Sequence, residues 1–165
     1  MIHGHSRAYE NFIRKLLVPP SLNLGSGNFK VGDFNVDIDR TVRPDIILNL
    51  EKFPYPLKKG AFRSVILHHS LEHLEDPERV LLECRNLLTK GGKILIVVPS
   101  PENRNYRMAG HKHFFTKNLL SSAVKKHFKD VKLFGYRGNT KGIKPFLGRF
   151  IGKFSPNEYI CMGVV

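Results

Sequence analysis

The sequence predicts an α/β fold whose central β-sheet is mostly parallel. Segments of strand length alternate with segments that repeat apolar residues at helical spacing, an order typical of parallel sheets with crossing helices. Residues 93–99 (KILIVVP) are also continuously apolar at their centre, as expected for a strand covered on both faces. With 165 residues and 41% hydrophobic residues, we expect one globular domain over residues 1–165.

The first predicted element is an amphipathic helix at residues 6–17. Tyr9, Ile13 and Leu16 recur at helical spacing, and Ser6 suits the N-cap. Further along the chain, seven strands are expected, at residues 21–24, 34–38, 45–48, 64–67, 93–99, 131–136 and 159–165.

Two more helices are predicted in the second half of the chain. Asp76 is a good cap residue and Pro77 fits the first helical turn, so a helix should begin there. Gly91–Gly92 should end this helix. Thr116 is predicted to cap the next helix.

The connections between the first strands are unusually short. Residues 25–33, 39–44 and 49–63 leave little room for crossover helices, which we expect to be single turns or absent. Half of the sheet should therefore be thinly covered, mainly by the N-terminal helix. An exposed sheet face favours association, so a homodimer is a hypothesis.

The net charge of +13 is concentrated in one region. Residues 103–153 contain 13 Lys or Arg and only one acid, Asp130. This basic segment leaves two interpretations open: a solvated basic surface, or attraction to nucleic acid, a phosphorylated metabolite or an anionic membrane surface. Within it, residues 141–154 read as a basic amphipathic helix that packs near the substrate cleft or rests on a membrane.

The sequence also bears on compartment. It has no apolar run of about 18 residues and no apolar centre near its N-terminus, so we expect neither a membrane span nor a signal peptide. Cys84 and Cys161 lie far apart and lack metal-ligand spacing, which fits a reducing cytoplasm.

The strongest functional pattern is a glycine turn after the first strand. LNLGSG places Gly25 and Gly27 where the chain must turn and approach a ligand closely, and Asp37 ends the next strand. Strand, glycine turn, strand and acid predict a nucleotide site. A nicotinamide site is disfavoured because Lys30 replaces the third small residue of its fingerprint and Asp37 lies too near. A P-loop is excluded because its motif is absent.

The ordered motifs resemble one family. The segments LNLGSG, NVDI, NLEKFPYP, SVILHHSLEHLEDPERVLLECRNLLTKGGKILIVVPSP and HKHFFT are similar to those of class I S-adenosylmethionine-dependent methyltransferases, in particular the type 11 methyltransferase-domain group. The resemblance spans about residues 21–120. It implies a Rossmann-like sheet of seven strands with the last strand reversed. It also implies a cofactor-binding core at 21–100, after the helical residues 1–20, and a substrate-side part at 101–165.

The resemblance implies a set of residues that bind S-adenosylmethionine, which becomes S-adenosylhomocysteine on methyl transfer. The set is Asn23, Gly25, Ser26, Gly27, Asp37, Ile38, Asn49, Leu50 and His68. The glycine turn would pass under the methionine part, with Asn23 helping to hold it. Asp37 would bind the ribose, Asn49 the adenine edge, and the His68 backbone the methionine amino group.

Three positions depart from the family pattern. Asn23 and Asn49 stand where many members have acids, and Arg63 stands where an Asp is usual. These departures weaken individual contacts without changing the resemblance.

Candidate catalytic residues are His69, His111 and Tyr106, because a general base helps when the nucleophile carries a proton. His113 and Phe114 are candidates for substrate contact, since they follow the fifth strand at the ligand-binding edge. A loop pair without catalytic function is the alternative for His111 and His113.

No metal is expected. His69 and His73 lie four residues apart, but HHSLEHL is not the HExxH pattern of zinc proteases. Glu72 and His73 are interpreted as residues that shape the start of a helix.

These patterns together predict a methyltransferase that uses S-adenosylmethionine on a small or anionic substrate, with an oxygen or nitrogen nucleophile favoured over carbon. The alternative from another class is a cofactor-binding or nucleic-acid-binding module without catalysis.

Overall fold

A computed structural model describes residues 6–102, 110–136 and 156–165 of this chain. The α-helices are α1 (Arg7–Leu16), α2 (Pro77–Leu87) and α3 (Lys117–Lys125). Short 3₁₀ turns, η1 and η2, lie at Arg40–Val42 and Leu71–His73. The strands are β1 (Ser21–Leu24), β2 (Phe34–Asp37), β3 (Ile46–Ile47), β4 (Phe62–His68), β5 (Leu88–Pro99), β6 (Lys129–Tyr136) and β7 (Glu158–Val164).

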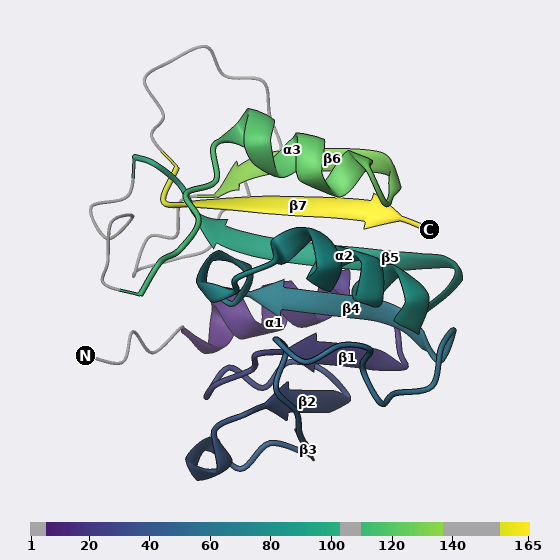
Figure 1. The fold of residues 1–165 in the computed structure, drawn as a ribbon. Helices are drawn as coiled ribbons and strands as arrows, with labels where there is room; N and C mark the ends of the chain where they lie inside the picture. The colour runs from purple at the N-terminus through teal and green to yellow at the C-terminus, as the bar shows by residue number, and fades with distance from the viewer. Residues whose placement is uncertain (1–5, 103–109, 137–155) are drawn as a thin grey trace.

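The strands form one seven-stranded sheet in the order β3-β2-β1-β4-β5-β7-β6 (Figure 1). The pairs β2–β3, β1–β2, β1–β4 and β4–β5 are parallel. The last strand, β7, runs antiparallel to both β5 and β6. The predicted mostly parallel sheet with a reversed last strand is confirmed.

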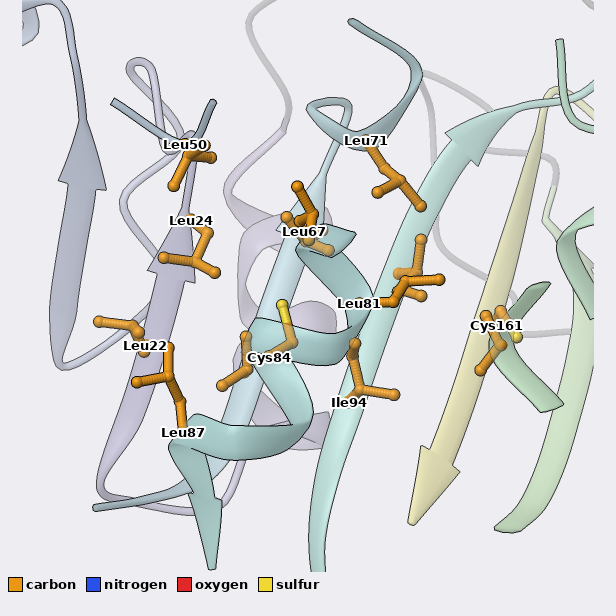
Figure 2. Close-up of a cluster of buried hydrophobic side chains, with 14 of the residues drawn as sticks. Leu22, Leu24, Leu50, Leu67, Leu71, Leu81, Cys84, Leu87, Ile94 and Cys161 are labelled. Carbon is orange, nitrogen blue, oxygen red and sulfur yellow. The ribbon is translucent and has the colours of Figure 1, made fainter. Parts of the chain in front are cut away.

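Two apolar layers cover the sheet. On one face α2 and α3 lie over the strands, and Leu81 and Leu87 of α2 pack with Leu22, Leu67 and Ile94 in the core that Figure 2 shows. On the other face lies α1. Its Tyr9 and Ile13 are buried among residues of the β1–β2 loop, β4, β5 and β7, which include Phe29, Val31, Ile66, Leu95 and Ile160.

The prediction of missing helices after the first three strands is confirmed, because residues 25–61 contain no α-helix. The predicted cover of this half is wrong in part. Residues Leu50, Phe53 and Tyr55 of the β3–β4 connection pack into the main core, whereas α1 lies over the loop after β1 and the central strands. Exposed apolar side chains still occur here: Phe34, Ile38 and Ile47 are 44%, 60% and 53% exposed.

The second helix ends earlier than predicted. It stops at Leu87, and Gly91–Gly92 lie inside β5 and not at the end of the helix. Leu88 is already extended and pairs with Phe62 of β4, with an irregularity before Ser64 pairs with Lys93. Strand pairing therefore replaces the last helical turn, and Gly91, at φ +74°, allows the irregularity.

Two parts of the sequence analysis fall outside the described residues: Tyr106, and the basic amphipathic segment 141–154. Among the described helices, none has the length and apolar character that crossing a membrane requires.

Candidate cofactor site at the carboxyl edge of the sheet

The predicted site residues meet at one edge of the sheet. Leu24, near the end of β1, pairs with Val36 of β2 and with Leu67 of β4. Because these strands are parallel, their carboxyl ends lie side by side, and the residues that follow them share one edge. Open α/β sheets bind ligands at such an edge.

The glycine turn is hydrogen-bonded to β2. The N–H groups of Gly25 and Ser26 both donate to the Val36 carbonyl oxygen at 2.9 Å. The N–H of Gly27 donates to Oδ2 of Asp37 at 2.7 Å. Gly25 and Gly27 have φ values of +69° and +48°, a region where a side chain is unfavourable, so the turn requires glycine at both positions.

The two glycines have different surroundings. A Cβ atom at Gly25 would lie 2.7 Å from Cβ of Ser70 and 3.6 Å from Cδ1 of Leu50. A Cβ atom at Gly27 would meet nothing within 4 Å. The turn is thus packed against η2 and the β3–β4 connection on one side, and its backbone has open space at Gly27.

The carboxylate of Asp37 is held by two backbone donors. Gly27 occupies Oδ2, and the N–H of Asp39 donates to Oδ1 at 2.9 Å. Asp37 is partly exposed, and the next residue, Ile38, is largely exposed. The carboxylate therefore stands beside the glycine turn, in a fixed orientation and accessible from solvent.

Asn23 supports the loop after the turn from below. Its side chain is fully buried, and its Nδ2 donates to the Phe29 carbonyl oxygen at 2.6 Å and to Oδ1 of Asn35 at 3.3 Å. A carboxylate could not donate to that carbonyl. The departure from the family's acid thus has a physical reason, since this loop is closed by an amide donor.

Asn49 and Leu50 follow β3 at the same edge. Oδ1 of Asn49 accepts the N–H of Glu51 at 2.9 Å. Leu50 is buried beside Gly25, and its carbonyl oxygen accepts the Tyr55 hydroxyl at 2.9 Å. Hydrogen bonds between the segment's own side chains and backbone thus fix it, and the Asn49 side chain is partly exposed.

The His68 ring packs toward α1. It stacks on Phe29 with ring centroids 4.0 Å apart, and its Nε2 lies 3.1 Å from the Tyr9 hydroxyl. The side chain is therefore part of the α1 layer, which leaves the backbone of His68 at the edge.

His69 lies between two carboxylates. Its Nδ1 is 3.2 Å from Oε1 of Glu72 and its Nε2 is 3.1 Å from Oε1 of Glu158. Oε2 of Glu158 also accepts the Tyr9 hydroxyl at 2.8 Å. Burial lowers the pKa of His69, but the hydrogen bonds and charges of Glu158 and Glu72 outweigh burial and raise the pKa to about 9. His69 is thus an imidazolium that donates through both nitrogens.

The other histidines lie in η2 and on the segment that precedes α3. The His111 ring packs edge-on against His73 with centroids 4.8 Å apart, and Nε2 of His113 lies 3.3 Å from the Glu75 carbonyl oxygen. His113 and Phe114 line a hollow of about 300 Å³ with residues of α2 and α3. None of the glycine-turn residues lines this hollow.

Sequence reasoning missed several residues that shape this edge. Tyr9 and Glu158 reach it from the two ends of the described chain, and no local pattern marks either one. Ser70, whose hydroxyl donates to the Leu24 carbonyl oxygen at 3.0 Å, also escapes notice. Glu72 and His73, interpreted from the sequence as residues that shape a helix start, lie in η2, the 3₁₀ turn before α2.

Comparison with known proteins bears on the family and fold of this chain. Residues 36–96 match a family model described as a methyltransferase domain. A search of the curated proteins returned no match.

Three of the solved structures that are similar to this chain contain methyltransferases. An S-adenosylmethionine-dependent methyltransferase from Archaeoglobus fulgidus is 16% identical, with a TM-score of 0.72, over 95% of this chain and 93% of its own. One from Thermotoga maritima is 19% identical, with a TM-score of 0.71, over 94% and 86%. A Haloferax volcanii complex of a methyltransferase with the Trm112 activator gives 12% identity and a TM-score of 0.69, over 96% and 90%. The resemblance drawn from the sequence is confirmed: this chain has the fold of S-adenosylmethionine-dependent methyltransferases, and its residues 36–96 match a methyltransferase-domain model.

Proposed function

We propose that this protein is a methyltransferase that takes its methyl group from S-adenosylmethionine. The observation that carries the proposal is the glycine turn, which is packed at Gly25, open at Gly27 and bonded to the fixed carboxylate of Asp37. That arrangement offers a close backbone approach beside an acceptor for ribose hydroxyls.

Each residue of the edge has a role in the proposed complex. Gly25, Ser26 and Gly27 lie under the methionine part of the cofactor, with Asn23 closing the loop from below. Asp37, followed by Ile38, accepts the ribose hydroxyls. The partly exposed amide of Asn49 contacts the adenine edge, with Leu50 packed beside it, and the backbone of His68 faces the methionine amino group.

The protein's part in the chemistry is orientation. Bound S-adenosylmethionine supplies an activated methyl group, which a nucleophile displaces in line. His69 donates to Glu72 and Glu158 through both ring nitrogens, so its proposed role is to position the edge and not to accept a proton. His111 and Tyr106 remain the candidate general bases, and His113 and Phe114 the candidate substrate contacts.

The substrate we expect is small or anionic, with an oxygen or nitrogen nucleophile. The reaction takes place in the cytoplasm, on one domain formed by the whole chain. The exposed side chains of Phe34, Ile38 and Ile47 keep a homodimer as a proposal. We also propose a protein partner, because one similar methyltransferase was solved in complex with an activator.

Calorimetric titration with S-adenosylhomocysteine tests the proposal. We expect saturable binding that Asp37→Ala weakens at least tenfold, because the ribose loses its acceptor. Asp39→Ala is the matched control. Its carboxylate, two residues away, accepts only from Thr41 among the described contacts, so affinity should stay within about twofold of wild type. Absence of binding to the wild-type protein would overturn the proposal.

A second candidate function is binding of an anionic polymer, as the basic segment 103–153 suggested. One observation favours it: a surface hollow of about 400 Å³ is lined by Arg85, Lys125, Lys126, His127, Phe128 and Lys129. Fluorescence anisotropy with single-stranded RNA should then give an affinity that falls steeply with salt and drops in Lys125→Glu/Lys129→Glu. Lys58→Glu/Lys59→Glu makes the same charge change elsewhere on the surface. Equal losses in the two variants would count against a defined site.

A further inference from the structure

Three side chains near the proposed site form a group whose close arrangement the proposed methyltransferase function does not explain. Glu72 and His73 lie in η2, and His111 lies on the segment that precedes α3. One ligand atom from each, a carboxylate oxygen or a ring nitrogen, lies within 4.8 Å of those of the other two. The sequence analysis rejected a metal pair of His69 and His73; in the structure His73 packs against His111, and His69 contacts Glu72 and Glu158.

The carboxylate of Glu72 supplies an independent indication of a ligand. The residue is 1% exposed, and its Oε1 is 3.2 Å from Nδ1 of His69. Its Oε2 is buried and has no hydrogen-bond partner among the residues that the structure describes. A buried carboxylate oxygen without a hydrogen-bond partner is costly, because the oxygen has lost its water without gaining a donor. A bound cation would compensate it.

The hydrogen bond of His73 fixes the ring in a form that can bind a metal. Its Nδ1 lies 2.8 Å from the Gly110 carbonyl oxygen. A carbonyl oxygen only accepts, so Nδ1 carries the proton and the lone pair is on Nε2. Metal-ligating histidines almost always donate their other N–H to a carbonyl or carboxylate in this way. The ring of His69 holds the Glu72 carboxylate in a similar manner, with Nδ1 3.2 Å from Oε1.

The backbone brings the two segments together. The N–H groups of Lys112 and His113 both donate to the Glu72 carbonyl oxygen, at 2.9 and 3.0 Å. His111 is thereby held beside η2. Ligand atoms around a tetrahedral ion are about 3.4 Å apart, and those of the group lie within 4.8 Å of one another, so the rings of His73 and His111 would turn inward to bind an ion.

We propose that Glu72, His73 and His111 bind a divalent transition-metal ion. Two imidazoles and one carboxylate favour Zn²⁺, Co²⁺ or Ni²⁺ over Mg²⁺ or Ca²⁺, which prefer all-oxygen sites. Three protein ligands leave positions open for water or a substrate oxygen. The ion would also fasten residues 110–115 to η2. A metal-bound His111 has no lone pair for a proton, so this role replaces its role as a general base.

Cobalt titration tests the proposal without any methyl transfer. His3 and His5 are additional metal-binding side chains near the N-terminus, so all proteins carry His3→Ala/His5→Ala. We expect one Co²⁺ per chain with a visible absorption band, which Zn²⁺ abolishes by displacement. His111→Ala and Glu72→Gln should each weaken Co²⁺ binding at least tenfold.

His113→Ala is the matched control, because His113 lies on the same segment and contacts Glu75 instead of the group. It should leave the Co²⁺ affinity unchanged. His111→Ala removes no core side chain, so it remains informative if Glu72→Gln fails to fold. Absence of the band, or binding that survives His111→Ala, would overturn the proposal. S-adenosylhomocysteine titration of the same proteins reports separately on the cofactor site.

Discussion

The two halves of the carboxyl edge are held in different ways. The glycine-turn half comprises the residues after β1, β2 and β3. Backbone N–H groups fix it: those of Gly25 and Ser26 donate to the Val36 carbonyl oxygen, and that of Gly27 donates to the Asp37 carboxylate. In the histidine half, formed around the ends of β4 and β7, side chains bond to side chains, with His69 between Glu72 and Glu158. The glycine-turn half therefore presents a fixed shape to a ligand, whereas the hydrogen bonds of the histidine half depend on the protonation of its side chains.

This difference predicts where substitutions are tolerated. Backbone hydrogen bonds persist after most side-chain substitutions. We therefore expect the glycine-turn half to lose stability only where a side chain closes the loop or where an added side chain has no room. The histidine half should weaken with each polar group removed, and its members should be coupled.

The largest effect is expected from Asn23→Asp. The new carboxylate would face the Phe29 carbonyl oxygen, which now accepts from Nδ2 at 2.6 Å, inside a fully buried position. We expect a loss of about 3 kcal/mol in the free energy of unfolding, measured by urea denaturation. Asn49→Asp is the matched control, because Asn49 is partly exposed and its Oδ1 only accepts from Glu51. A cost within about 0.5 kcal/mol is expected for it, and equal costs would contradict the role given to Asn23.

Gly25→Ala should follow in size. The added Cβ would lie 2.7 Å from Cβ of Ser70, and the residue has φ +69°, so we expect a loss of about 2 kcal/mol and no detectable S-adenosylhomocysteine binding. Gly27→Ala separates the two causes. It has φ +48° but open space, so a cost of about 1 kcal/mol from the backbone alone is expected. Equal losses of stability in the two variants would mean that the packing of Gly25 against η2 does not contribute to stability.

The glycine turn shows which parts of the fold and of the site the sequence could predict. Strand order, the reversed last strand and the glycine turn depend on local patterns: apolar runs, short connections and glycines between a strand and an acid. The histidine half does not. Tyr9, His69 and Glu158 meet only because the sheet brings α1, β4 and β7 together, and no spacing along the chain encodes that meeting.

The misread helix end has a tertiary origin. Gly91–Gly92 is a good helix end by local rules, but pairing of Leu88 with Phe62 ends the helix first. The partners of His69 and His73 are also set beyond local spacing: His69 has a positive φ of 50°, the chain turns there, and the two rings have different partners. Tertiary contacts decided both cases, and local patterns carry no information on them.

Glu158→Gln tests the histidine half. The carboxylate accepts from both the Tyr9 hydroxyl and Nε2 of His69, and the neutral amide would leave the His69 charge less compensated. We expect a loss of about 2 kcal/mol in unfolding free energy, by urea denaturation near neutral pH. Glu102→Gln changes another carboxylate, one that contacts the Tyr159 hydroxyl at the surface, and should cost less than about 0.5 kcal/mol. A neutral effect of Glu158→Gln would show that the network adds no stability.

Tyr9→Phe should cost about 1 kcal/mol, because it keeps the buried ring and removes only the hydroxyl bonds to Glu158 and His68. The double variant Tyr9→Phe/Glu158→Gln sharpens the comparison. Both changes act on the hydrogen bond between the Tyr9 hydroxyl and Glu158, so the double variant should cost less than the sum of the two single effects. Strict additivity would mean that the two residues act independently.

The smallest effect concerns a surface contact far from either half. Glu78 bonds to Lys126 and His127, and although burial raises its pKa, these hydrogen bonds and the nearby charge of Lys126 outweigh burial and lower the pKa below its usual value. A lowered carboxyl pKa stabilises the fold above the unfolded pKa of about 4.3, and the gain is lost as pH falls through the folded pKa. Because the pair is exposed, the difference between wild type and Glu78→Gln should not exceed about 0.5 kcal/mol at pH 7 and should vanish at pH 3. A difference that persists at pH 3 would assign the contribution to packing over the hollow beside α3 instead of to charge.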